Sequence, residues 1–451
     1  MVTCMYTAEN GYKYGFAGAT PGILMALAMF FVGVTGFCIN PLRHAGAITI
    51  PELFEKRFGQ RVRWAAGVVI VLGGLLNMGV FLRITGEFLV LVSGFELAHL
   101  ERNLLLMMTV LLLLGTIYTV VGGMLSVLVT EFLQFLVMST GLLAVTLLIL
   151  VKIGWDPLVA TVAEHHGDGG FNPFVCQGMG WPYVVFNALE CLAGALTWQT
   201  MISRVLASKD VRTGRRIYTR TSFFFACRFV LPGIRGIAAL AWLAPGAFAG
   251  LPSAFQQNKA LYAMPLFLSV FVPVGLMGLL LAAMLAASMS CTSSYMMTWA
   301  SVIYNDIVTP LRKTLWSERR GLLWNRMIVS LIGAFLLFYG LWYPLQGDVY
   351  AYLLVTGTIY MASISTMLVA CCYWKRANNW GATAAIVVGA VIPIACLVFE
   401  QVRKMSPDEV QLWRCYSGIG AFAATALAMV VFSLLKPQSD VSPPGQSVEG
   451  S

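Results

Sequence analysis

The chain of 451 residues is too apolar for a soluble protein: it is 59% hydrophobic and 11% charged, whereas soluble domains carry about 25% charged residues. The net charge of +9 does not indicate nucleic-acid binding, because the basic residues lie in short loops between apolar runs. This composition predicts an all-α polytopic membrane protein.

The first residues are polar and glycine-rich, with TAENGYKYGFAGATPG at 7–22, and do not resemble a complete span. Apolar runs of bilayer-spanning length follow. We expect about eleven complete spans after the partial first helix, near 21–40, 64–93, 104–121, 124–151, 183–203, 221–243, 264–303, 325–343, 350–373, 381–399 and 416–435. Residues 1–435 are thus predicted to form a single transmembrane domain, and 436–451, rich in Pro, Ser and Gly, a disordered tail.

Loop charge predicts the orientation. Basic residues concentrate in the loops near 43–63, 204–220, 312–326 and 375–376, and the intervening loops are poor in them. The positive-inside rule places these basic loops and the tail in the cytoplasm, with the protein in the inner (plasma) membrane. Cys176 and Cys415 fall in predicted outer loops and could pair, whereas scattered cysteines in apolar runs are typical of small buried side chains.

Enzymatic motifs such as H-E-x-x-H, G-x-S-x-G and a Walker sequence do not occur, so neither an enzyme nor an ATP-driven pump is predicted. Ionisable residues at membrane depth are costly and become the functional candidates. Arg83 and Glu87 stand four residues apart on one predicted helix and can neutralise each other. Arg235 either reaches the interface, pairs with Glu190 or faces a cavity that takes an anion. Glu131 and Arg228 are the other members of this set.

Two glycine and proline clusters indicate interrupted helices. Gly11, Gly15 and Gly18 precede Pro21, and Pro232-Gly233 lies inside an apolar run. Unwound backbone at membrane depth is tolerated where it lines a cavity or is buried in protein, and it points to a transporter's binding site.

The stretch 281–306, LAAMLAASMSCTSSYMMTWASVIYND, carries hydroxyls in the middle of an apolar helix. Ala287, Ser290, Cys291 and Ser294 recur at helical spacing and share one face. Such a face can pack closely against another helix or hold a small hard cation with its oxygens. Spacing alone leaves both interpretations open.

Five stretches follow one another in a family-specific order. They are TIPELFEKRFG at 49–59, YTVVGGMLSVLVTEFLQ at 118–134, WQ at 198–199 with RVLASKD at 204–210, VPVG at 272–275 leading into the 281–306 stretch, and YWKR at 373–376 with GA at 381–382. Together they resemble the sodium:solute symporter family, which includes bacterial proline and sugar/sodium symporters.

The resemblance implies a LeuT-like fold of two inverted five-helix repeats with extra C-terminal helices. The family's first core helix begins well before the site, so here it is incomplete and the chain is N-terminally shortened. We expect that Met1 is a misassigned start or that the chain is a fragment, ahead of the alternative that the protein lacks a normal first helix. The resemblance also implies a sodium site formed by the Ala287 carbonyl, by Ser290 and Cys291, and by backbone carbonyls near Thr3 and Tyr6. Cys291 replaces the family's Ser or Thr, and Glu131 replaces its Asp.

These observations predict a sodium-coupled symporter that imports a small organic solute, with Na⁺ as the co-transported ion. Membrane-depth arginines favour a carboxylate such as a sialic acid, an organic acid or an amino acid, whereas Leu353, at a position resembling a sugar contact, disfavours sugars. The predicted substrate-binding residues are Glu9, Asn10, Arg83, Trp198, Gln199 and Arg235. The alternative is a transporter-like sensor, a binding module or an uncoupled carrier. Beyond solute, sodium and the lipid bilayer, we expect no nucleic acid and no obligate protein partner.

Overall fold

The computed structural model describes residues 2–93, 99–244, 246–311, 317–342, 349–403 and 407–437, and within these ranges every regular element is a helix. The elements in chain order are α1 (Val2–Tyr14), η1 (Gly15–Ala19), α2 (Thr20–Thr35), α3 (Ile39–His44), α4 (Ile50–Phe58), α5 (Gln60–Gly79), α6 (Phe81–Ser93), α7 (Leu100–Lys152), α8 (Trp155–His166), η3 (Gly167–Gly170), α9 (Gly180–Thr197), α10 (Gln199–Leu206), α11 (Val211–Trp242), α12 (Ser253–Gln257), α13 (Lys259–Phe271), α14 (Val274–Val302), η4 (Ile303–Val308), η5 (Thr309–Leu311), α15 (Glu318–Trp342), α16 (Val349–Tyr373), α17 (Asn379–Arg403) and α18 (Pro407–Leu435).

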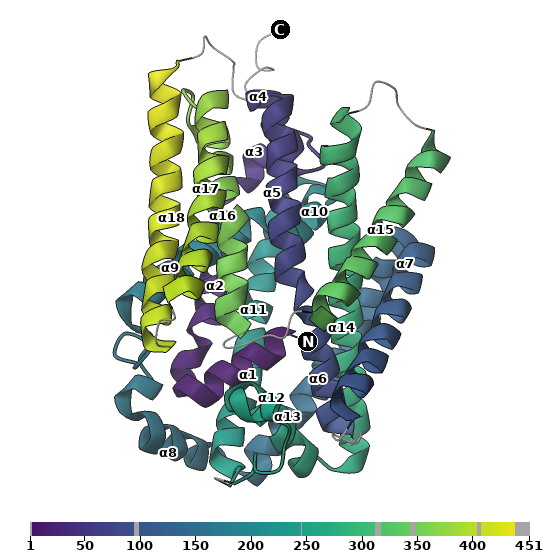
Figure 1. Ribbon diagram of the computed structural model, residues 1–451, viewed down its shortest axis with the longest axis vertical. Coiled ribbons are helices and arrows are strands. Elements are labelled where there is room, and N and C mark those ends of the chain that lie inside the picture. Colours follow the sequence, from purple (N-terminus) through teal and green to yellow (C-terminus); the bar gives the residue numbers. More distant parts are fainter. Residues whose placement is uncertain are drawn as a thin grey trace.

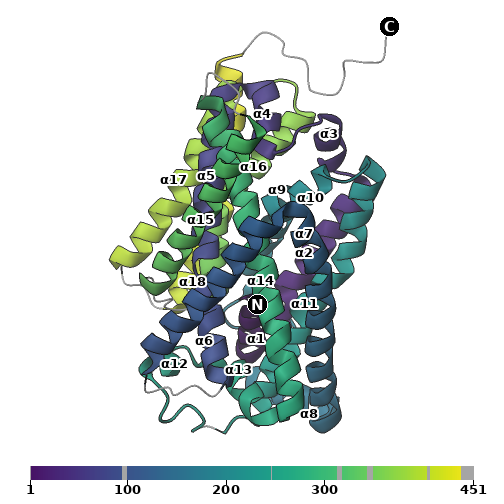
Figure 2. The same cartoon turned by 90° about the vertical axis from the view of Figure 1, so that its right-hand side faces the viewer.

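Ten candidate spans, by length and apolarity, occur in the described ranges. The predicted run at 183–203 is not one of them, because it breaks at Trp198 into α9 and α10. Trp198 has a ψ of 101°, which is extended backbone and ends the first helix. The long α7 supplies two candidates, Leu100–Gly122 and Val127–Lys152, and Figure 2 shows α7 bending back on itself.

The two glycine and proline clusters differ in their effect on the helices. Gly15 ends α1 with a φ of +59°, a left-handed conformation that favours glycine, and the chain then turns through η1 into α2. Pro232, by contrast, does not interrupt α11, which continues to Trp242. The predicted break in this second helix is therefore absent, and Gly233 serves close packing instead.

Glycine allows α1 and α11 to cross almost backbone to backbone. A Cβ added at Gly236 of α11 would lie 1.9 Å from the carbonyl oxygen of Ala8, and one added at Gly11 of α1 would lie 2.2 Å from the carbonyl oxygen of Gly233. Small residues permit such contacts between helices in lipid. This crossing places the second half of α1 against the last third of α11.

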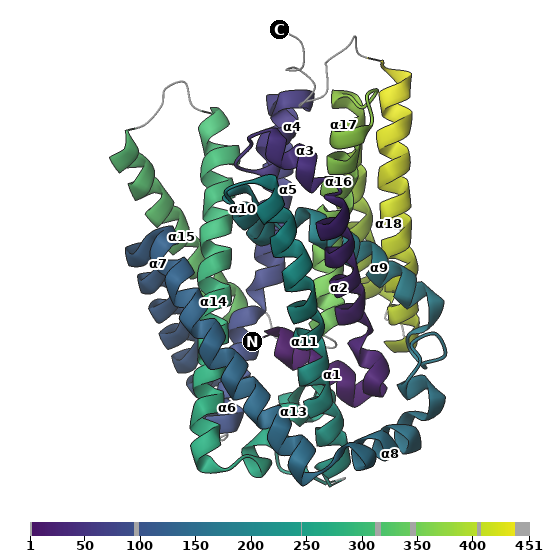
Figure 3. The same ribbon diagram turned by 180° about the vertical axis from the view of Figure 1, so that it is seen from behind.

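Figures 1 and 3 show α1 starting about halfway along the height of the bundle, with α3 and α4 at one end and α8, α12 and α13 at the other. Helices α17 and α18 pack beside α16 at the edge. The predicted cytoplasmic loops lie together at the α3–α4 end: Arg43 donates to the Ser208 carbonyl, and Arg57 to the Cys371 and Trp374 carbonyls. We call this the basic end.

Large apolar side chains are exposed along α2, α7, α17 and α18, among them Phe30, Leu113, Val398 and Leu427. An apolar belt of this extent suits contact with lipid. Helix α1 has 13 residues, fewer than the about 20 that a complete crossing needs. Cys176 and Cys415 are buried free thiols rather than a disulfide. The predicted disordered tail lies outside the described residues from 438 onward.

Substituting Gly236 tests the α1–α11 crossing. Gly236→Ala forces the two backbones apart, and overpacking of this kind costs about 1–3 kcal/mol. We expect a lower thermal unfolding temperature of the purified protein, followed by tryptophan fluorescence. Gly275→Ala on α14 is the matched control, because nothing lies within 4 Å of its added Cβ, and it should leave the unfolding temperature unchanged or slightly raised. Equal unfolding temperatures for the two variants would contradict the crossing.

Candidate functional site

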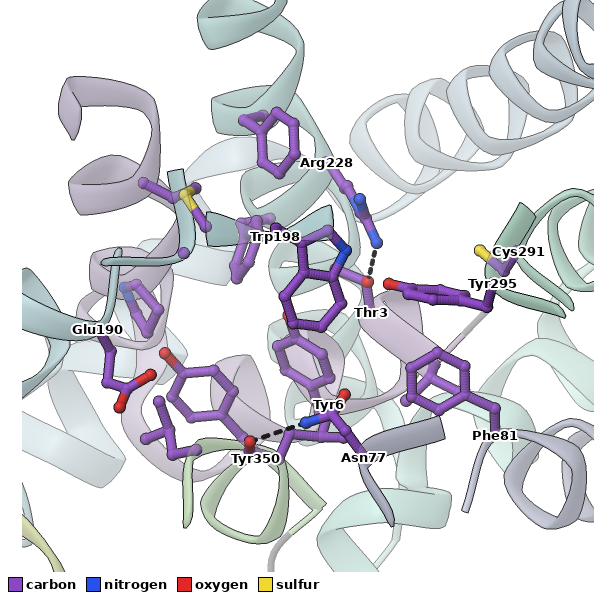
Figure 4. Close-up of a pocket in the computed structure, with 18 of the residues that line it drawn as sticks. Thr3, Tyr6, Asn77, Phe81, Glu190, Trp198, Arg228, Cys291, Tyr295 and Tyr350 are labelled. Atoms are coloured by element: carbon purple, nitrogen blue, oxygen red, sulfur yellow. Dashed lines mark hydrogen bonds between the residues drawn. The ribbon is translucent and has the colours of Figure 1, made fainter. Parts of the chain in front are cut away.

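A cavity of about 180 Å³ lies in the middle of the bundle, where α1, α9, α11, α14 and α16 meet (Figure 4). We call it the central cavity. Its walls are largely aromatic, and they include Tyr6, Phe81, Trp198, Phe225, Tyr295 and Tyr350. Two charged residues also line it, Arg228 and Glu190. A mostly apolar cavity with a few polar groups is the usual form of a small-molecule site.

Arg228 extends from α11 into the central cavity and is exposed to it. Its Nη2 donates to the Oγ1 of Thr3, in the first turn of α1, and its guanidinium lies 5.5 Å from the centre of the Phe225 ring. Within the described ranges no carboxylate forms an ion pair with it. Cys291, Tyr295 and Tyr6 lie within electrostatic reach of the guanidinium. A positive charge at membrane depth is thus held by neutral groups beside open space.

Glu190 on α9 reaches the central cavity from another side (Figure 4). It is 5% exposed, and its Oε1 accepts a hydrogen bond of 2.5 Å from Thr358 of α16. The hypothesised Arg235–Glu190 pair is therefore wrong. Arg235 is fully buried and donates to the Leu142 carbonyl at 2.7 Å, on α7.

Two neutral polar residues of the cavity wall, Asn77 and Tyr350, are hydrogen-bonded to protein. The Asn77 amide on α5 donates to the Leu353 carbonyl at 2.9 Å and to Thr356 Oγ1 at 3.2 Å. The Tyr350 hydroxyl donates to Asn187, and the rings of Tyr350 and Tyr6 stack at 5.0 Å. These bonds tie α5, α9 and α1 to α16 and fix the shape of the cavity wall.

Three residues of the predicted cation site, Thr3, Tyr6 and Cys291, line the central cavity together. Ala287 is buried and is not among the lining residues, and neither is Ser290, whose carbonyl accepts from Ser293 at 3.2 Å. The Thr3 carbonyl accepts from Thr7 at 2.7 Å. The side of α14 that carries Cys291 therefore faces α1.

Of the predicted substrate residues, Trp198 lines the central cavity. Arg83 pairs with Glu87 at 2.9 Å, as its spacing suggested, and Glu87 also accepts from Tyr262 at 2.6 Å. The remaining candidates also lie outside this cavity. Glu9 pairs with Lys13, Asn10 lines a smaller cavity of about 30 Å³, Gln199 lines the vestibule described next, and Arg235 packs against α7.

A second cavity, of about 940 Å³, lies at the basic end between α7, α10, α14 and α15, and we call it the vestibule. Trp198, packed edge-to-face on Tyr295 at 5.7 Å, faces the central cavity, whereas the next residue, Gln199, faces the vestibule. The α9–α10 break therefore lies between the two cavities.

A hydrogen-bonded cluster lies on the vestibule side of the α9–α10 break. Arg204 of α10 donates to Glu131 of α7 at 2.9 Å and to the Ser294 hydroxyl of α14 at 2.8 Å. Ser294 in turn donates to Glu131. The shared face on α14 thus serves two purposes, with Cys291 toward the central cavity and Ser294 in this cluster.

A buried ion pair, which we call the basic-end latch, lies where α14 gives way to the π-helical turn η4. Asp306 in this turn is completely buried, and it accepts from Arg63 Nε at 2.9 Å and from Thr49 Oγ1 at 2.8 Å. Thr49 also caps α4 by accepting from the Glu52 amide at 3.2 Å. The pair Arg63–Asp306 therefore joins α5, the start of α4 and the end of α14.

Sequence reasoning included Arg228 and Glu190 among the membrane-depth ionisable residues but not among the substrate-binding residues. The missing information was which charge has a partner. Arg83 has an acid one helical turn away, whereas the partners of Arg228 and Arg235 come from other helices. Tyr350 and Asn77 carried no signal, because a tyrosine or asparagine in an apolar run does not indicate which way it faces.

Comparisons with known proteins agree with this arrangement. The profile of the sodium:solute symporter family matches residues 4–389. Over 421 residues the chain is 25% identical to "Sodium/glucose cotransporter 4" of Danio rerio, covering 86% of this chain and 61% of that protein. Over 443 residues it is 24% identical to "Sodium/myo-inositol cotransporter 2" of Sus scrofa, covering 89% and 64%. The chain thus spans less than two thirds of the length of these curated relatives.

Among solved structures, a Na⁺-coupled sialic acid symporter in a substrate-bound outward-open state superposes with a TM-score of 0.75 at 19% identity, covering 98% of this chain and 88% of that one. This likeness confirms the predicted all-α LeuT-like fold.

Removing the charge of Asp306 tests the basic-end latch. Asp306→Asn keeps the side-chain size but leaves Arg63 without its buried anion, and losing one partner of a buried pair costs about 3–5 kcal/mol. We expect a large drop in the thermal unfolding temperature. Glu55→Gln is the matched control, because Glu55 contacts the same Arg63 with 35% of its side chain exposed, and exposed pairs contribute about 1 kcal/mol or less. A larger drop for Glu55→Gln would contradict the latch.

Proposed function

Because the chain belongs to the sodium:solute symporter family, we propose that it is a sodium-coupled symporter importing a small organic solute that carries a carboxylate. The observation that carries this proposal is the central cavity, which holds an arginine that pairs with no carboxylate of the described ranges, beside three residues of the predicted cation site. The ion supplies the driving force, since one inward positive charge contributes about 2.3 kcal/mol per 100 mV.

Arg228 supports a carboxylate rather than a neutral solute. A guanidinium presents a planar fork of donors that matches two carboxylate oxygens, and such bonds are about twice as strong as neutral ones. The curated relatives are named for glucose and myo-inositol, and the solved neighbour for sialic acid. A polyol would need free neutral donors and acceptors, yet the Asn77 amide already bonds Leu353 and Thr356. The acidic sugar therefore fits this cavity better than a neutral one.

Loop charge and the apolar belt support an orientation. We place the basic end in the cytoplasm and the protein in the plasma membrane, because Lys and Arg concentrate on the cytoplasmic side of membrane proteins. The vestibule then opens on the cytoplasmic side of the partition formed by Trp198 and Tyr295. Solute released inward would leave through it.

A second candidate function is an uncoupled carrier or a transporter-like binding module. Two observations favour it: Cys291 supplies a thiol where sodium prefers oxygen, and Arg228 donates to Thr3 inside the predicted cation site. Both features would lower the affinity of the predicted site for sodium. Measuring uptake distinguishes this candidate from the symporter.

Uptake into proteoliposomes containing the full chain tests the proposal. Radiolabelled N-acetylneuraminate, lactate, proline, glucose and myo-inositol are supplied with an inward sodium gradient, an inward proton gradient or neither. We expect sodium-driven accumulation of at least one carboxylate and none of the neutral sugars, because a carboxylate supplies an anion for Arg228 and a neutral sugar does not. Protein-free liposomes are the control. No accumulation under any gradient would overturn the symporter, and equilibration without a sodium requirement would support the uncoupled carrier.

Two substitutions on α14 test the proposed cation site. Ser290→Ala removes a candidate oxygen ligand and should raise the sodium concentration for half-maximal uptake several-fold. Cys291→Ser replaces a soft thiol by the hard oxygen that sodium prefers and should leave this concentration unchanged or lower it. Ser330→Ala, exposed on α15, is the control and should match the wild type. Unchanged sodium dependence in Ser290→Ala would remove Ser290 from the site.

A further inference from the structure

The guanidinium of Arg228 occupies the side of the central cavity where the cation site is predicted. It donates to the hydroxyl of Thr3. Cys291 and Tyr6 are among the groups that interact with its charge. Figure 4 shows Arg228 and the Tyr295 hydroxyl converging on Thr3, with Cys291 beyond them on α14. These are the residues at which α1 and α14 would hold sodium together.

A sodium ion in this region and the guanidinium would repel each other, because both carry a positive charge. The repulsion is not cancelled from nearby, because within the described ranges Arg228 has no carboxylate partner. The other charged lining residue, Glu190, is engaged by Thr358 on the far side of Trp198 and Tyr350 (Figure 4). Sodium and the tethered guanidinium therefore exclude each other from this part of the cavity.

We propose that Arg228 is a tethered internal cation that keeps sodium out of the Thr3–Tyr6–Cys291 region until the solute's carboxylate draws the guanidinium away from Thr3. This proposal rests on the proposed function and assigns the coupling between sodium binding and solute binding to a single side chain. Arg228 then acts as a positioning and specificity residue for both ligands.

The competition for the guanidinium favours a carboxylate over Thr3. The threonine hydroxyl is a single neutral acceptor, whereas a carboxylate offers two charged oxygens in the geometry of the guanidinium fork. A carboxylate also neutralises the charge that repels sodium. A neutral polyol offers acceptors no stronger than Thr3 and leaves the charge in place. Sodium and carboxylate thus raise each other's affinity, as linkage requires.

Equilibrium binding of ²²Na⁺ alone, to the purified full chain in lipid nanodiscs without solute, tests the tether. Arg228→Gln removes the internal cation and should lower the sodium dissociation constant about tenfold, within the usual range of coupling between sites. Arg228→Lys retains the charge and should bind sodium as weakly as the wild type. Arg220→Gln, exposed two turns earlier on α11, is the matched control and should not change the constant.

The hydroxyl of Thr3 offers an independent pair of variants if Arg228→Gln does not fold. Thr3→Ala releases the guanidinium and should lower the sodium dissociation constant several-fold, whereas Thr3→Ser keeps the acceptor and should match the wild type. Equal constants for wild type and Arg228→Gln, or in its absence for wild type and Thr3→Ala, overturn the tether. Because this measurement needs no transport, failure of uptake with a clear Arg228→Gln effect would overturn the proposed function and leave the tether standing.

Discussion

The close crossing of α1 and α11 is the constraint on which the centre of this protein depends. Gly11, Gly233 and Gly236 let two backbones approach within contact distance, so the second half of α1 meets the last third of α11. Thr3 consequently reaches Arg228, and Tyr6 reaches Tyr350 across the cavity. A side chain at Gly11 or Gly236 would widen the crossing and separate the groups that define the site.

The arginines that join helices in this protein fall into two groups according to their partners. Arg63, Arg83 and Arg204 each lie against a carboxylate within 2.9 Å, and these pairs join helices away from the central cavity. Arg228 instead relies on a hydroxyl and an aromatic ring. An arginine at the cavity wall that pairs with no carboxylate of the described ranges is therefore the observation behind the proposed carboxylate solute.

Composition, loop charge and motif order were enough to predict the helical fold and the gathering of the basic loops. They were not enough to predict the site. The Pro232-Gly233 pair suggested a break, but the break lies at Trp198, because glycine can serve packing as well as unwinding. Arg83 and Arg228 look alike in the sequence, and only the three-dimensional arrangement distinguishes the arginine with an acid from the one without. Cys291 faces the cavity as expected, whereas the orientations of Ala287 and Ser290 depend on how α14 is rotated.

The short helix α10 has a mechanical consequence. It is joined to α9 through the extended residue Trp198 and carries Arg204 in its last turn. The junction carries the contact of Trp198 with Tyr295 on the side of the central cavity, and α10 carries the contacts of Arg204 with Glu131 and Ser294 on the side of the vestibule. A change in the position of this one short segment would therefore alter contacts on both sides of the broken helix.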